Sequence, residues 1–146
     1  MKLVSYIKEE REQLAMLING LLYDMEVLHP DLPNSMNLLL NYWEDYFPVA
    51  QAGELMLREG TRVSTKGFPL HEVQLLAPVP FPTSCRDGYA FRQHVAAARR
   101  NRKVEMIPEF DQYPIFYFTN HHSIGGPGEV VCMPNHFEKL DFELEV

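Results

Sequence analysis

Three prolines within six residues divide this chain. The segment "APVPFP", residues 77 to 82, carries Pro78, Pro80 and Pro82. Each proline removes a backbone N–H donor and forces the preceding residue toward extended backbone, so no helix can run through the segment. We therefore expect a strand and a rigid connector here, at the start of a second domain. The predicted domains are residues 1–72 and residues 73–146.

The first predicted domain begins with strands. Residues 2–7 and 13–18 are apolar enough for two strands. Asn19 and Gly20 follow, the dipeptide favoured in a type I′ hairpin turn because both residues tolerate positive φ. Residues 21–28 are then the expected return strand.

Helices are expected after these strands. Asn34 or Ser35 can cap a helix over residues 36–47, which Pro48 should interrupt. A second helix is predicted over residues 50–60. The first domain is therefore a small α+β unit.

The second half mixes one helix with apolar strands. A helix is expected within residues 85–103, beginning near Gly88, and a buried aromatic strand over residues 113–120. Residues 121–131 are expected to be a loop rich in glycine and proline that runs into a short strand. Residues 139–146 alternate apolar and acidic side chains as a final strand does, with no turn or cap after it. The pattern predicts a truncated sheet.

Composition limits the possible partners. A net charge of −7 argues against nucleic acid or an anionic membrane as the main partner. The basic run at residues 99–103 is expected to be a solvated helix end. Cys85 and Cys132 cannot form a disulfide framework, and no apolar run approaches the roughly 20 residues of a membrane helix. We therefore expect a soluble protein of the reducing cytoplasm.

Two glutamates near the last residue could bind a cation. On a strand, Glu143 and Glu145 project to the same face with Cα atoms roughly 6.5–7 Å apart. Their carboxylates could together hold one hard cation such as Mg²⁺ or Ca²⁺. The alternative is that they form the solvated face of an edge strand. The sequence of residues 139–146 alone leaves both interpretations open.

Asp87 and His94 are a second candidate pair. The two residues are seven positions apart, so on a continuous helix their side chains would lie on one face, about 10 Å apart along the axis. A metal ligand and a general base could then act on opposite ends of a small substrate. Alternatively, Asp87 caps the helix and His94 is a partly buried histidine with one hydrogen bond.

Two motifs together resemble a known family. The stretch "DGYAFRQH", residues 87–94, followed by "LDFELEV", residues 140–146, resembles the fumarylacetoacetate hydrolase family, and the likeness extends over about residues 73–146. The resemblance implies a mixed β-roll that binds a divalent cation, usually Mg²⁺, Mn²⁺ or Ca²⁺. It also implies hydrolysis of carbon–carbon bonds in acylpyruvate-like β-diketo acids, whereas some relatives isomerise, decarboxylate or hydrate related keto acids.

The resemblance assigns roles to individual residues. Those that match the family's metal ligands are Asp87, Glu143 and Glu145. Tyr89 matches a substrate-contacting tyrosine, and His94 matches the histidine that activates water. Lys103 falls where some members place a basic residue over the substrate carboxylate.

The family's usual length also bears on activity. Members run well past 146 residues, and their later half supplies another metal-ligating Asp and further substrate-binding residues. We therefore expect an α+β chain that ends within its β-roll and does not turn over substrate alone. It would work as a homodimer or be completed by the missing C-terminal half, with a small keto acid as substrate. The alternatives are a keto-acid isomerase, decarboxylase or hydratase, or a non-catalytic fragment that dimerises or binds a partner.

Overall fold

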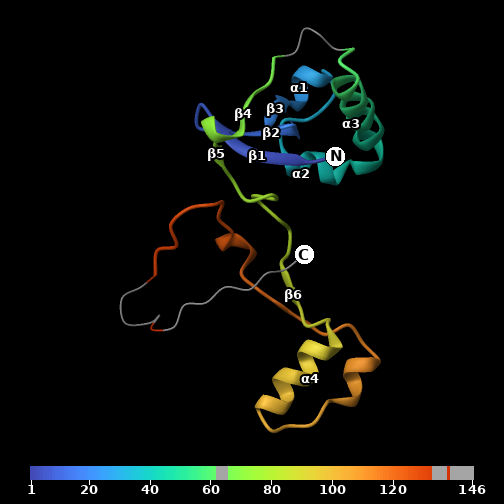
Figure 1. Cartoon of the computed structure of the whole chain (residues 1–146), viewed down its shortest axis with the longest axis vertical. Helices are drawn as coiled ribbons and strands as arrows, with labels where there is room; N and C mark the ends of the chain where they lie inside the picture. The colour runs from blue at the N-terminus through green and yellow to red at the C-terminus, as the bar shows by residue number, and fades with distance from the viewer. Residues whose placement is uncertain (62–65, 133–137, 139–146) are drawn as a thin grey trace.

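The structure, a computed structural model, describes residues 1–61, 66–132 and 138. It has an α+β fold, as predicted, with one body formed by the first residues and a smaller one around a single helix (Figure 1). No helix in these ranges is long and apolar enough to cross a membrane.

The larger body is built on a five-stranded sheet. Its strands are β1 (Leu3–Lys8), β2 (Arg11–Ile18), β3 (Leu21–Asp24), β4 (Phe68–Pro69) and β5 (Gln74–Leu75). Their order is β4-β3-β2-β1-β5, and every neighbouring pair is antiparallel. The sheet curls into a half-barrel, with short strands at both edges.

Two tight hairpins set the register of this sheet. Asn19 and Gly20 have φ of 52° and 83°, which confirms the predicted turn between β2 and β3. Glu9 and Glu10, with φ of 51° and 61°, form an equally short turn between β1 and β2. Sequence analysis did not predict this second turn, because glutamate has no particular preference for positive φ.

The return strand is shorter than predicted. β3 ends at Asp24, and Met25–Leu28 form the short helix α1 where the strand was expected to continue. Met25 and Leu28 are both fully buried. A helical turn brings side chains three positions apart to one side, so both residues can enter the same core.

Two helices follow. α2 (Met36–Asn41) begins at Ser35, whose Oγ accepts a hydrogen bond from the Leu38 N–H at 3.2 Å. This bond identifies Ser35, one of the two predicted caps, as the capping residue. α3 spans Trp43–Arg58.

The expected interruption at Pro48 is wrong. The break between helices falls at Tyr42, whose φ of −124° and ψ of 42° are not helical, and α3 continues through Pro48. Pro48 lies in the second turn of α3, where it removes only one backbone hydrogen bond. Ala50 and Gly53 on the same helix are buried, and Leu28 contacts the Gly53 position. This packing holds the helix together across the proline.

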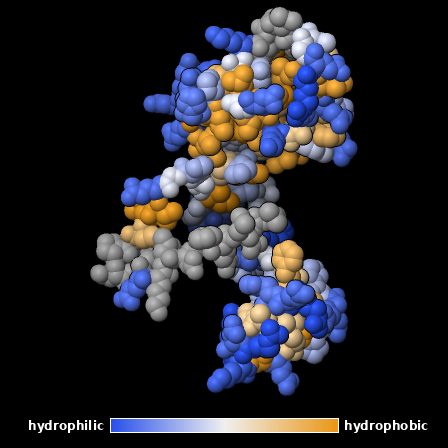
Figure 2. All heavy atoms as spheres, viewed as in Figure 1, coloured by the Kyte–Doolittle hydropathy of each residue, from blue (hydrophilic) through white to orange (hydrophobic). Residues whose placement is uncertain are grey.

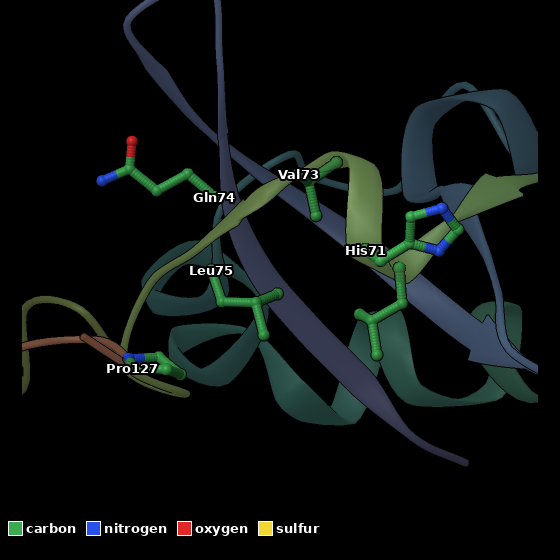
Figure 3. Close-up of a pocket in the computed structure, with 6 residues that line it drawn as sticks. His71, Val73, Gln74, Leu75 and Pro127 are labelled. Atoms are coloured by element: carbon green, nitrogen blue, oxygen red, sulfur yellow. The ribbon is translucent and has the colours of Figure 1, made fainter.

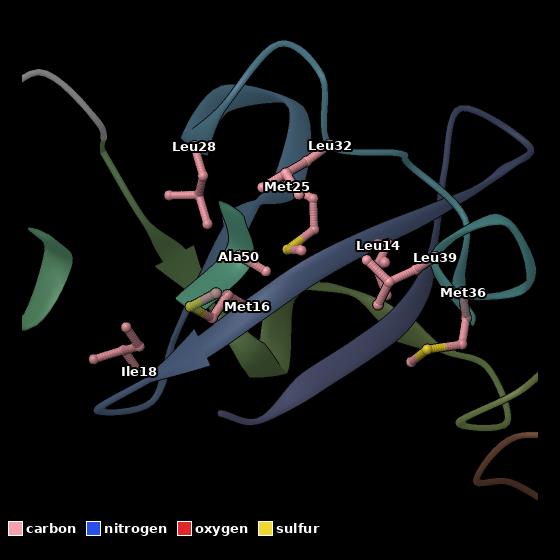
Figure 4. Packing of buried hydrophobic residues seen from close by; sticks show 9 residues of the cluster. All are labelled: Leu14, Met16, Ile18, Met25, Leu28, Leu32, Met36, Leu39 and Ala50. Atoms are coloured by element: carbon pink, nitrogen blue, oxygen red, sulfur yellow. The ribbon is translucent and has the colours of Figure 1, made fainter. Parts of the chain in front are cut away.

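The core lies between the sheet and the helices (Figure 4). Its nine buried residues are Leu14, Met16, Ile18, Met25, Leu28, Leu32, Met36, Leu39 and Ala50. The β2 residues in this set alternate, as expected for one face of a strand. Ala15, on the opposite face, packs with Tyr6 and Leu22 in a second, smaller cluster.

Beyond the prolines the chain forms a smaller unit. Its regular elements are β6 (Arg86–Gly88), α4 (Arg92–Asn101) and β7 (Phe116–Phe118), with 3₁₀ turns at Pro108–Asp111 and His121–Ser123. β6 and β7 form a two-stranded antiparallel sheet. β5, in contrast, pairs with β1 of the first sheet. The division of the chain at residue 73 stays a prediction.

Three expectations for this second unit are wrong. The helix begins at Arg92, not near Gly88, because residues 86–88 pair with β7. β7 was expected to be buried, but all three of its side chains are exposed. Residues 124–132 form no strand. The predicted final strand, residues 139–146, lies outside the described residues.

Candidate functional site

Asp87 lies on β6 directly opposite Tyr117 of β7. The Tyr117 hydroxyl donates a hydrogen bond of 2.5 Å to Asp87 Oδ2. No described residue donates to Oδ1, which leaves this oxygen available as a ligand. Asp87 and His94 therefore do not share one helix as predicted, and Asp87 is not the helix cap, since Phe91 precedes α4.

Tyr89 lies between two other rings. Its ring centroid is 6.2 Å from that of His94 and 6.3 Å from that of Phe110, and both contacts are edge-to-face. The backbone N–H of Tyr89 donates to the Ile115 carbonyl at 3.0 Å, which continues the β6–β7 ladder by one residue. The strand pairing thus fixes where the tyrosine ring lies.

The Tyr89 hydroxyl is buried and has no hydrogen-bond partner among the described residues. Buried hydroxyls without a partner are uncommon in folded proteins, since each costs free energy. This hydroxyl can therefore donate to an oxygen atom from outside the described residues, such as one on a substrate.

His94 is the third residue of α4 and is exposed. Its ring contacts the Tyr89 ring edge to face. An imidazole in contact with solvent can accept a proton from water. The helix that carries His94 is anchored by Val95, its one buried residue.

Lys103 ends the same helix through its backbone. Its φ is 58°, and its N–H donates to the Arg100 carbonyl while the Val104 N–H donates to the Arg99 carbonyl. These two bonds define a Schellman motif with Lys103 at the left-handed position. The exposed Lys103 side chain makes no hydrogen bond or ion pair within the described part of the chain. Residues 100–103 of the basic run are exposed at the helix end, as predicted, whereas Arg99 is half-buried and donates from Nε to the Glu105 carbonyl.

An ion pair joins the beginning of α4 to the 3₁₀ turn before β7. Arg92 donates from Nε to Asp111 Oδ1 at 2.8 Å and from Nη2 to Oδ2 at 3.1 Å. Hydrogen bonding to Arg92 lowers the pKa of the Asp111 carboxyl below its usual value, and Asp111 raises the pKa of Arg92. This two-bond contact fixes the helix relative to the chain that leads to β7.

Comparison with known families identifies this region. The sequence model of the family described as "Fumarylacetoacetate (FAA) hydrolase C-terminal" matches residues 83–146. Residues 83–146 are therefore similar to this family. No curated protein and no solved structure matches the chain. The match confirms the resemblance read from the two motifs, and we call residues 83–146 the family segment.

The family segment contains all six predicted site residues, and the structure describes four of them. It brings Tyr89 against His94 and places Asp87 two residues before Tyr89, whereas no contact joins the Lys103 side chain to these residues. Glu143 and Glu145 lie outside the described residues. Within the described ranges, no three His, Cys, Asp or Glu side chains form a group that could hold a metal ion. The predicted metal site remains a prediction.

Sequence reasoning missed two residues beside Asp87. One is Tyr117, which holds the Asp87 carboxylate from 30 positions away. The other is Arg86, whose guanidinium lies 5.4 Å from the Phe116 ring centroid and 5.0 Å from that of Phe118. The only available signal was the aromatic run in residues 116–118, and it contains nothing that identifies the pairing register.

Proposed function

We propose that this chain is part of a metal-dependent hydrolase that cleaves carbon–carbon bonds in acylpyruvate-like β-diketo acids. The observation that supports the proposal best is the family match over residues 83–146, which includes both motifs with their acidic and imidazole side chains. In this proposal, the family segment forms the first portion of a mixed β-roll.

The proposed cation is Mg²⁺, Mn²⁺ or Ca²⁺, held by Asp87 with Glu143 and Glu145. Asp87 Oδ1, to which no described residue donates, suits this role, since carboxylate oxygens are the preferred ligands of hard cations. Tyr117 donates to the other oxygen and restricts how the carboxylate can rotate. When bound, the cation supplies positive charge for enolate oxygens of the substrate.

The neighbouring residues act on the substrate and on water. The Tyr89 hydroxyl, buried and without a described partner, donates a hydrogen bond to a substrate oxygen. His94, exposed beside it, takes a proton from the water that attacks the carbonyl carbon. Lys103 is proposed to attract the substrate carboxylate from the exposed end of α4.

Binding of Mn²⁺, followed by electron paramagnetic resonance, tests the metal site in the chain. We expect Asp87→Asn to weaken Mn²⁺ binding by at least about tenfold. Asp111→Asn is the matched control, since it removes a carboxylate of the same segment that is already bound to Arg92. Unchanged Mn²⁺ affinity in Asp87→Asn would disprove the proposed ligand.

Turnover is tested separately, with an acylpyruvate as substrate and Mg²⁺ or Mn²⁺ as the cation. The protein assayed is the full product of the gene that encodes this chain. We expect pyruvate release, its loss in His94→Ala, and retention of Mn²⁺ binding in that variant. Keto–enol interconversion without pyruvate release would instead favour an isomerase of the same superfamily. Near-normal turnover in His94→Ala would show that another group activates water.

A second candidate function is non-catalytic self-association. The exposed fractions of Phe116, Tyr117 and Phe118 on β7 are 42%, 59% and 67%, which is much apolar surface for one short strand. Light scattering during size-exclusion chromatography would distinguish the two candidates. A concentration-dependent dimer that neither binds Mn²⁺ nor releases pyruvate supports self-association, whereas a monomer at micromolar concentration excludes it.

A further inference from the structure

One edge of the five-stranded sheet is formed by β5. The Leu76 N–H donates to the Ser5 carbonyl of β1 at 2.9 Å. Because backbone groups alternate in direction along an antiparallel ladder, the N–H and carbonyl of Leu75 face away from β1. Such unpaired edge groups attract other chains unless something covers them.

A glycine of the family segment lies directly against this edge. A Cβ atom built on Gly126 would lie 2.4 Å from the Leu75 carbonyl oxygen and 2.8 Å from both Cα and C of Leu76. All three atoms belong to the backbone of the edge strand and its continuation, so a side-chain rotation cannot relieve the contact. Only a residue without a Cβ allows the loop to lie this close.

The neighbouring glycines of the same loop differ. A Cβ on Gly125 or Gly128 would meet no atom of the described residues within 4 Å. None of the three has positive φ, so alanine suits the backbone at each position and only the space around the Cβ differs. Of these three glycines, only Gly126 is required by close approach to described residues.

The next residue of the loop extends the contact. Pro127 lines a cavity of about 590 Å³ whose other lining residues come from the chain around β5 (Figure 3). They are Leu70, His71, Val73, Gln74 and Leu75. In Figure 3, Pro127 lies beside Leu75, at one end of this row of residues. Two successive residues of the family segment thus meet the first sheet.

We propose that the edge of β5 is the docking surface for the family segment and that Gly126 is the residue seated on it. The loop around Gly126 covers the unpaired backbone of Leu75 and joins the family segment to the first sheet. This surface is separate from Asp87, Tyr89 and His94. The proposal does not depend on the proposed enzymatic activity.

Hydrogen exchange of the complete chain tests this docking. In Gly126→Ala, the added methyl group forces the loop off the strand, and we expect exchange at the amides of Leu75, Leu76, Gly125 and Gly128 to accelerate by about tenfold. Gly125→Ala and Gly128→Ala are matched controls with the same chemical change, and they should exchange as the unchanged chain does. Equal exchange in Gly126→Ala and the two controls would overturn the proposal.

Two further results would also count against it. If Gly126→Ala accelerated exchange equally in β1, β2 and β3, position 126 would support the whole fold rather than the edge. A nuclear Overhauser effect between the α-protons of Gly126 and Leu76 is expected in the unchanged chain. Its absence would overturn the proposal without reference to any variant.

Discussion

The N-terminal part of the chain, residues 1–82, and the family segment differ in how much apolar surface they bury. Within the described residues, every buried hydrophobic side chain except Val95 lies at or before Ala77. The family segment instead exposes large apolar side chains such as Phe91 and Phe118. Figure 2 shows apolar spheres at the surface of the smaller body as well as on the larger one. A sheet with helices on one face closes a core by itself, whereas two short strands and one helix do not.

The contacts that hold the two parts are different as a result. The N-terminal part is held by a continuous apolar cluster (Figure 4). The described family segment is held by the Arg92–Asp111 ion pair, the Tyr117–Asp87 hydrogen bond and rings packed edge to face. Polar contacts at an exposed site contribute little free energy. We therefore expect local opening around the four described candidate residues to require less free energy than opening of the N-terminal part.

The largest effect should come from truncating the core. Leu39 is fully buried in the apolar cluster of the N-terminal part. We expect Leu39→Ala to lower the free energy of unfolding by about 2–5 kcal/mol, because it removes buried methyl groups and leaves a cavity. Urea denaturation followed by circular dichroism measures this change.

Leu40 supplies the matched control for this comparison. It follows Leu39 on α2 but is 44% exposed. Leu40→Ala should change the free energy of unfolding by no more than about 0.5 kcal/mol. If both variants were equally destabilised, the N-terminal part would not have the closed core that distinguishes it.

A smaller effect is expected at a buried polar pair within the same part. Tyr6 is fully buried, and its hydroxyl donates a hydrogen bond to Asp24, whose other oxygen lies 3.4 Å from Lys8 Nζ. Tyr6→Phe should cost about 1–3 kcal/mol of stability, because it removes the donor from a buried carboxylate. Tyr42→Phe, at an exposed position, should cost almost nothing.

This pair also predicts a dependence on alkaline pH. Burial, and then the hydrogen bond and charge of Asp24, raise the pKa of Tyr6 above its usual range. The folded state therefore keeps the Tyr6 proton at a pH where the unfolded state loses it. The stabilisation is complete below the unfolded pKa of about 10 and falls as the pH rises further. Tyr6→Phe should weaken the alkaline loss of stability, and an unchanged pH profile would contradict this origin.

The two parts also differ in how well the sequence predicts them. In the N-terminal part, the hairpin at Asn19 and Gly20 and the cap at Ser35 follow from chemistry within a few residues of each site. The predicted break at Pro48 in helix α3 is wrong, because the burial of Ala50 and Gly53 outweighs the free-energy cost of a proline inside the helix. Local signals are reliable where long-range packing agrees with them.

In the family segment, the determining contacts join distant residues. The stretch around Asp87 looks helical, but its pairing with Tyr117, 30 positions away, makes it a strand. The apolar run in β7 predicted burial, yet its three side chains are exposed, and Arg86 packs on two of their rings. The residue types of the candidate site could be read from the motif, whereas the geometry between Asp87, Tyr89 and His94 could not.

A still smaller change in stability is expected at the C-terminal end of α4. Lys103 has φ of 58°, which costs a non-glycine residue roughly 1 kcal/mol. Lys103→Gly should relieve this strain and stabilise the helix end by up to about 1 kcal/mol, partly offset by the greater flexibility of glycine in the unfolded chain. Slower hydrogen exchange at the Lys103 and Val104 amides would measure this.

Lys103→Ala is the control, because it removes the charge but keeps the Cβ atom. It should leave exchange at these amides unchanged. If Lys103→Ala and Lys103→Gly protected the amides equally, the side-chain charge rather than the backbone would determine the stability of the helix end.

The smallest effect on stability is expected at the exposed ion pair of Arg92 and Asp111. It sharpens the contrast with the buried pair of Tyr6 and Asp24. Hydrogen bonding to Arg92 lowers the pKa of Asp111, so any stabilisation is present above the ordinary carboxyl pKa and is lost as the pH falls through the lowered value. Titration followed by nuclear magnetic resonance should show this low pKa and its return toward the ordinary value in Arg92→Gln. Arg86→Gln, which removes a guanidinium that packs on Phe116 and Phe118, should leave it low. If both variants raised the pKa of Asp111 equally, the low pKa would come from the combined positive charge of the family segment rather than from the contact with Arg92.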